Sequence, residues 1–320
     1  MRFAFTDDQL AFRDAVRDLL ANECPPSAVR AAWENDDGRS GATWGALAEM
    51  GVLGALAPEA AGGLGLTVLD IVLIIEEAGY AALPEPLVEH ALVAVPVLDD
   101  PARAAAGEIT VTAALGDPYV LYGESADAVV VDDDDLLYVV ERADALLTPS
   151  AGVDGSRRLA WVEWDPTSPI GDETTRHAAF DRGALGTAAL LVGLARRMLD
   201  LTVEYAKERT QFGVPIGSFQ AVKHHLADSR IAIEFARPLV YRAAWSVTEG
   251  DPNAATHVSM AKSLASDAAT LTASQALQCH GAIGYSYEYD LHLFMKRAWA
   301  LAASWGDAAW HRARVGRAIL

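Results

Sequence analysis

Residues 209–220 read RTQFGVPIGSFQ, a short segment that separates two long helical patterns. Gly213 and Pro215 interrupt the helical pattern there, because glycine and proline disfavour a helix interior. Four patterns with the 3.6-residue period of an amphipathic helix occupy the C-terminal half, over about 183–209, 218–248, 254–280 and 288–317. Four long helices with short links predict an antiparallel four-helix bundle, which we place at residues 176–320.

The pattern over residues 1–105 also predicts helices. Thr6 followed by Gln9 is typical of a helix N-terminus, in which the two side chains bond to each other's backbone. A strongly apolar helix is expected from Thr67 to Tyr80. We therefore expect an N-terminal helical domain over residues 1–105.

Residues 106–175 differ in character from both flanks. Short runs rich in Val, Tyr and Trp, bounded by Asp, Gly, Ser and Pro, predict β-strands; they lie at 109–112, 128–131, 136–140 and 159–164. Four consecutive aspartates at 132–135 predict a solvated turn between two of them. The chain is thus expected to be mainly α with a small β domain at residues 106–175.

The charge and the cysteine content of the chain exclude several classes of binding partner and site. The formal net charge of −19 and the pI of about 4.7 argue against nucleic acid and against an anionic membrane surface. Two cysteines, Cys24 and Cys279, are too few for a disulfide scaffold, which predicts reduced thiols and a cytoplasmic protein. Neither lies at metal-ligand spacing, so no metal site is expected. Charged residues interrupt every apolar stretch before it reaches spanning length, and the N-terminus lacks the apolar run of a signal peptide.

Three further segments join RTQFGVPIGSFQ in one pattern: PEAAGGLGL at 58–66, EEAG at 76–79 and QCHGAIGY at 278–285. Together they resemble, in order and spacing, the signature segments of acyl-CoA dehydrogenases. The resemblance covers almost the whole chain. It implies that family's fold of an N-terminal helical domain, a middle β-barrel, here reduced, and a C-terminal four-helix bundle. It also implies an oxidoreductase of lipid metabolism that forms a double bond between Cα and Cβ of an acyl-CoA thioester with FAD as cofactor.

The resemblance assigns roles on the adenine and pyrophosphate side of FAD. Arg209 would pair with the pyrophosphate, Phe212 would offer an apolar face, and Gln278 would donate a hydrogen bond. In the family these residues serve the FAD of a neighbouring subunit. The matching positions are Arg209, Gln211, Phe212, Phe219, Gln278, Gly281, Ala282 and Gly284. Structural roles compete with these: Arg209 could complete a helix dipole, and the two glycines could form a plain helix end.

The catalytic base of the family is missing from both positions where a Glu is expected. Trp305 occupies the position near the C-terminus that most members use, and Gly183 occupies the position that a minority use. Neither side chain can take a proton. Asp181, two residues from Gly183, is the remaining carboxylate that a shift of register would bring to the site.

The β domain also departs from the family. It is short, and it lacks the T-E-P-x-x-G-S-D and W-I-T-N segments that cover the isoalloxazine and hold the thioester; Gly116-Asp117-Pro118 is the nearest remnant. The chain therefore resembles the short, non-catalytic subunit of heteromeric α2β2 acyl-CoA dehydrogenases, which actinobacteria use in steroid degradation. That resemblance implies a heterotetramer with a longer subunit that carries the Glu. An electron-transfer flavoprotein is implied as the acceptor.

Two other functions stay open on the sequence. The chain could be a stand-alone homomeric dehydrogenase that uses a displaced carboxylate such as Asp181. It could instead be a non-enzymatic acyl-CoA-binding or scaffold protein. The combination of Arg209, Gln211, Phe212 and Gln278 argues against a scaffold, which needs none of them together.

Overall fold

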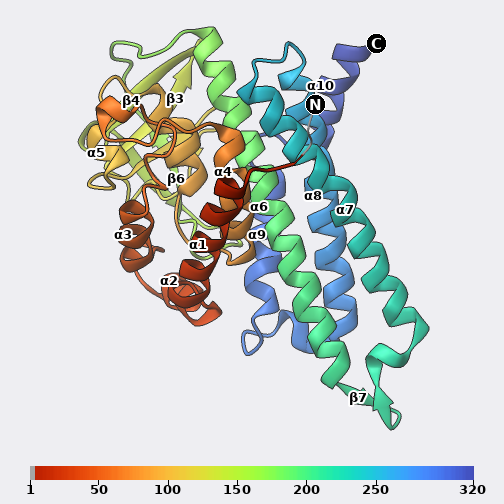
Figure 1. The fold of residues 1–320 in the computed structure, drawn as a ribbon. Coiled ribbons are helices and arrows are strands. Elements are labelled where there is room, and N and C mark those ends of the chain that lie inside the picture. The colour runs from red at the N-terminus through yellow and green to blue at the C-terminus, as the bar shows by residue number, and fades with distance from the viewer. Residues whose placement is uncertain (1–3) are drawn as a thin grey trace.

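A computed structural model describes residues 4–320 (Figure 1). Helices form the first part of the chain, as predicted. Thr6 and Gln9 make the expected reciprocal cap of the first helix, and Thr67 with Asp70 makes the same cap before the apolar one. The helices here are α1 (Asp7–Glu23), α2 (Pro26–Glu34), α3 (Gly41–Glu49) and α4 (Val68–Tyr80), with a short 3-10 turn, η1 (Glu59–Ala61).

A buried segment that the periodicity did not predict connects α4 to the β region. It contains the π-helix η2 (Val88–Ala94), the 3-10 turn η3 (Val95–Val97) and the short α5 (Ala102–Ala105). Every residue of η2 is buried, including Glu89 and His90. Both ring nitrogens of His90 lie within hydrogen-bond distance of backbone groups, and burial lowers the pKa of this side chain to about 4.

The β region consists of two three-stranded sheets, with strand orders β1-β3-β4 and β2-β6-β5. The four predicted strands are confirmed, and the structure adds β2 and β5. Their bounds are β1 (Val111–Ala114), β2 (Tyr119–Val120), β3 (Ala128–Asp133), β4 (Leu136–Glu141), β5 (Leu146–Ser150) and β6 (Leu159–Glu163), with η4 (Arg142–Asp144) between β4 and β5. The predicted turn at 132–135 is shorter than expected: Asp132 and Asp133 belong to β3, and the turn is formed by Asp134 and Asp135. Asp132 forms a half-buried ion pair with Arg176 at 2.6 Å.

Long helices form the rest of the chain: α6 (Glu173–Glu208), α7 (Gln220–Thr248), α8 (Ala254–His280), α9 (Leu291–Ala303) and α10 (Ala308–Ile319). The short elements between them are β7 (Thr210–Gln211), β8 (Val214–Pro215), η5 (Ile216–Ser218) and η6 (Gly281–Tyr285). The prediction of one helix over 288–317 is wrong. Trp305 and Gly306 have φ of +56° and +80°, a left-handed conformation that ends α9 and separates it from α10.

The helix α6 is the central element of the molecule, and Figure 1 shows it running from the β region to the β7–β8 end. It crosses α4 at a close contact made by two glycines. A β-carbon at Gly193 would collide with the Glu76 carbonyl, and one at Gly79 would collide with the Leu190 carbonyl. The helix is long and apolar enough to cross a membrane by composition, but 78% of its apolar window is buried inside the fold. That burial is typical of a core helix.

Candidate functional site

The segment 209–220 forms a rigid projection at one end of the bundle (Figure 1). Arg209 caps the C-terminus of α6, and β7 and β8 then pair as a two-stranded hairpin. Gly213 and Phe212 adopt positive φ of +81° and +53°, which makes the tight turn. The Phe212 side chain is 92% exposed, and its ring meets the edge of Phe219 with centroids 6.2 Å apart. The hairpin therefore presents an apolar ring to whatever lies outside this chain.

The segment 278–285 lies at the same end of the bundle. Gln278 is exposed in the last turn of α8, and Gly281 ends that helix with a positive φ of +64°. The Tyr205 ring of α6 stacks on His280 with centroids 4.3 Å apart, which ties the two helix ends together. Gly284 is buried, because a β-carbon there would lie 2.9 Å from that of His280. The exposed Ala282 completes the set of predicted cofactor residues.

The donor set at this end fits a phosphate-containing cofactor. Arg209 is exposed, and within residues 4–320 its guanidinium has no hydrogen bond or ion pair, so all of its donors are available. A β-carbon at Gly281 would meet open space, so close approach of a ligand's phosphate to this backbone is unobstructed. An exposed aromatic ring, an unpaired guanidinium and an amide suit the adenine and pyrophosphate parts of a dinucleotide. This end is called the hairpin end below.

The two positions where a catalytic Glu is expected meet in space. A β-carbon at Gly183 would lie 2.6 Å from Cε3 of Trp305, so the indole covers the glycine directly. Trp305 is 8% exposed and packs edge-on against Phe180 with centroids 5.8 Å apart. The two positions expected for the base, Gly183 and Trp305, are therefore in direct contact.

Buried side chains from α8 and α10 hold the loop that carries Trp305. Lys262 is fully buried and donates to the carbonyls of Ala302 and Gly306 at 3.1 and 3.0 Å, and to the Ser266 hydroxyl at 3.2 Å. His311 lies 2.8 Å from the Trp305 carbonyl through Nε2. Burial lowers the pKa of Lys262 to about 7 and that of His311 to about 4. These contacts fix the left-handed conformation that points the indole at Gly183.

Asp181 does not face this space as an unpaired carboxylate. Its two oxygens accept from the Arg314 guanidinium at 2.5 and 3.2 Å. Arg314 comes from α10, so the pair joins the start of α6 to the last helix. Both oxygens of Asp181 are therefore occupied by the Arg314 guanidinium.

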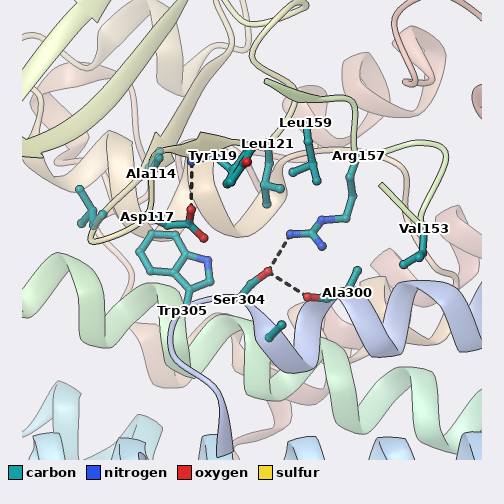
Figure 2. Close-up of a pocket in the computed structure, with 13 residues that line it drawn as sticks. Ala114, Asp117, Tyr119, Leu121, Val153, Arg157, Leu159, Ala300, Ser304 and Trp305 are labelled. Carbon is teal, nitrogen blue, oxygen red and sulfur yellow. Dashed lines mark hydrogen bonds between the residues drawn. The ribbon is translucent and has the colours of Figure 1, made fainter. Parts of the chain in front are cut away.

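Figure 2 shows a cavity beside Trp305, between the β region and α9. Its volume is about 270 Å³. The walls are mostly apolar, and the remnant Asp117 sits at its rim with one oxygen accepting from the backbone N–H of Tyr119 at 3.0 Å. Arg157 reaches in from the β side and donates to the Ser304 hydroxyl at 2.7 Å. The region around Trp305, Gly183 and this cavity is called the closed half-site below.

A buried network of charges that sequence reasoning missed supports the closed half-site. Arg297 of α9 binds Asp154 at 2.6 Å and the carbonyl of Leu83. The Trp305 indole N–H donates to Glu89 at 3.4 Å, and burial raises the pKa of Glu89. Burial also raises the pKa of Glu85 to about 7, although this carboxylate pairs with Arg39 at 2.7 Å. The residues of this charge network come from four segments that are distant in the sequence. The available signal was Glu89, the one acidic residue inside the otherwise apolar stretch 87–97, with Glu85 just before that stretch.

Comparisons with known proteins agree with this geometry. Residues 6–100 match the family model for the N-terminal domain of acyl-CoA dehydrogenase, and residues 174–320 match the model for its C-terminal domain. The acyl-CoA dehydrogenase IpdE2 of Mycobacterium tuberculosis is 37% identical over 300 residues, which cover 91% of each chain.

Two solved structures share the fold over nearly their whole length. A chain of the ChsE4-ChsE5 complex from Mycobacterium tuberculosis superposes with a TM-score of 0.92 at 26% identity, covering 99% of this chain and 98% of the other. A chain of the Tcur3481-Tcur3483 steroid ACAD gives a TM-score of 0.89 at 23% identity, with 98% of each chain covered. The mainly helical fold with a small β region, predicted from the sequence, is thereby confirmed.

Proposed function

Because the chain belongs to the acyl-CoA dehydrogenase family, a family of FAD-dependent oxidoreductases, we propose that it is the non-catalytic subunit of a heteromeric acyl-CoA dehydrogenase. In this proposal the hairpin end completes the adenine and pyrophosphate side of an FAD that a longer partner subunit holds. The partner supplies the Glu that removes the Cα proton. The bound FAD accepts the hydride from Cβ.

The contact between Trp305 and Gly183 is the observation that carries the proposal. Both positions that hold the base in the family lack a carboxyl group, and the indole fills the space above them. Asp181 is bound by Arg314. The chain therefore has no base of its own at this place, and its activity needs a second chain.

The separation of the two regions along α6 supports a shared cofactor site. Gly183 and Arg209 lie 26 residues apart on this helix, which is roughly 39 Å at the α-helical rise. That distance exceeds the length of an extended FAD. Arg209 would bind the pyrophosphate through paired charge-assisted bonds, Gln278 would donate to a polar edge, and Phe212 would cover the apolar face of the cofactor.

The names of the structural neighbours suggest the class of substrate and assembly. One neighbour is a chain of a two-component complex, and the other is a chain of an enzyme described as a steroid ACAD. We propose by analogy a steroid-derived acyl-CoA as substrate, an α2β2 assembly, a cytoplasmic location, and an electron-transfer flavoprotein as the acceptor.

Co-expression with a longer acyl-CoA dehydrogenase chain from the same genome tests the proposal. The full chain alone is expected to purify without flavin, and the co-expressed pair is expected to be yellow with one FAD for each pair of chains. The flavin content follows from the absorbance at the flavin band, and the composition follows from native mass. Flavin at about one per subunit in the isolated chain would overturn the proposal, as would a homomer that turns over acyl-CoA and loses that activity in Asp181→Asn.

A further inference from the structure

The Arg157 guanidinium is poorly satisfied for a buried cation. The residue is 6% exposed, and it has one side-chain hydrogen bond within residues 4–320, from Nη2 to the Ser304 hydroxyl. Its Nε is buried and has no partner. A guanidinium carries five N–H donors, and leaving them unpaired away from water is costly.

The neighbouring carboxylates do not neutralise this cation directly. Asp154 and Glu89 both act on Arg157 through space. Asp154, however, is bound by Arg297 at 2.6 Å, and Glu89 accepts from the Trp305 indole. Within residues 4–320, neither carboxylate forms a hydrogen bond or an ion pair with the Arg157 guanidinium. One positive charge is therefore left without a close partner at the wall of the cavity.

The cavity around this charge is apolar and suited to a ring. Aliphatic side chains and two aromatic rings form most of its lining, from Leu115, Leu121, Val153, Leu159, Tyr119 and Trp305. Its volume of about 270 Å³ is at the low end of small-molecule sites. The single acidic side chain among the thirteen lining residues, Asp117, is exposed at the rim, where water screens it.

We propose that the closed half-site of this chain binds a small monocarboxylate with an apolar, ring-sized body. The carboxylate would accept from the free donors of Arg157, and the body would lie against Trp305 and the leucines of the β side (Figure 2). This site lies apart from the hairpin end and requires no flavin. It therefore stands whether or not the chain completes a partner's FAD site.

Titration calorimetry of the full chain with 2-naphthoate tests the proposal, with the isosteric but neutral 2-naphthamide as the comparison ligand. Naphthoate is expected to bind once per chain and about tenfold or more tightly than the amide, since a charge-assisted bond is stronger than a neutral one. In Arg157→Gln this preference is expected to disappear. No saturable binding, or the same preference in Arg157→Gln, would overturn the proposal.

A second variant tests the proposal independently if Arg157→Gln does not fold. Ala303 is exposed on α9 and lines the same cavity, so Ala303→Phe is expected to obstruct it with little effect on the unfolding temperature. Both ligands should then fail to bind. Unchanged binding of naphthoate to Ala303→Phe would place the ligand elsewhere and would also overturn the proposal. The flavin content of the co-expressed pair is measured separately, so failure of one proposal is distinct from failure of the other.

Discussion

The hairpin end and the closed half-site differ in the exposure of their aromatic and charged side chains. Phe212 is 92% exposed, whereas Trp305 is 8% exposed. Arg209 extends from the end of a helix with its donors free, whereas Arg157 is buried beside Ser304. An exposed ring on a fixed turn contributes almost nothing to the folding of this chain, because it makes few contacts with it. The buried indole contributes to folding directly.

The two regions therefore differ in whether their side chains contact the rest of this chain. The Phe212 and Arg209 side chains of the hairpin end are exposed and make few contacts within this chain. At the closed half-site, Trp305 packs over Gly183 and its indole N–H donates to the buried Glu89 of η2. Substitutions at the two places should therefore separate cleanly, with lost stability at one and lost flavin at the other.

The largest effect is expected from Trp305→Ala. Removing a buried indole leaves a cavity over Gly183 and should lower the free energy of unfolding by about 3–5 kcal/mol. Trp299→Ala on the preceding helix α9 is the control for loss of an indole, because that side chain is 39% exposed and should cost much less. Urea unfolding of the full chain gives both values. Equal destabilisation by the two variants would show that the indole does not fill a packed space.

Arg209→Gln should produce the opposite result. The isolated chain should unfold as the wild type does, because Arg209 has no partner within residues 4–320. In the co-expressed pair, loss of the charge-assisted bonds should weaken FAD by about 3 kcal/mol, or roughly a hundredfold. Arg230→Gln is the control, since Arg230 is exposed on α7 and pairs with Glu234. Retention of full flavin by the Arg209 variant after gel filtration would contradict the role of the hairpin end.

The hairpin end could be predicted from the sequence because its information is local. Helical periodicity gave α6, α7 and α8, and a contiguous motif identified Arg209 and Phe212. For the closed half-site, the sequence predicted only that no Glu occupies the two expected base positions. Nothing in the sequence around Trp305 predicts its left-handed conformation, which a bulky residue rarely adopts. Lys262 and His311, which lie on other helices, hold the backbone of this loop through hydrogen bonds.

The buried charges were unpredictable for the same reason. Arg297 and Asp154 are 143 positions apart in the sequence, and only the packing of α9 against the β region brings them together. Glu85 and Glu89 would be read as surface residues by composition, yet both are buried. Where a charge is neutralised by a distant partner, a single sequence does not reveal the pairing.

Gly183→Ala tests the contact between the two vacated base positions. The new methyl group would displace the indole and should cost about 1–3 kcal/mol in the wild type. In the Trp305→Ala background the cost should largely vanish, because the colliding ring is absent; a double-mutant cycle measures this coupling. Gly316→Ala on α10 is the control, since a β-carbon there meets open space. Additive costs for Gly183→Ala and Trp305→Ala would contradict direct contact.

The smallest effect concerns the lysine that holds the Trp305 loop. Burial lowers the pKa of Lys262 to about 7, against 10.5 for an exposed lysine, so the unfolded chain binds more protons between these values. Stability should therefore rise with pH across that window, by about 1 kcal/mol from roughly pH 7 to pH 8.5.

Lys262→Met should lose this rise, whereas Lys223→Met, on the exposed start of α7, should keep it. Urea unfolding at the two pH values gives the difference. Burial raises the pKa of Cys24 to about 12 from 9.0, so the unfolded thiol begins to ionise near pH 8.5; this effect is common to both variants and cancels in their comparison. If Lys262→Met retains the full rise, the ammonium does not govern the stability of the closed half-site. If it loses the rise while the flavin content of the co-expressed pair stays unchanged, the two regions are independent in energy as well as in place.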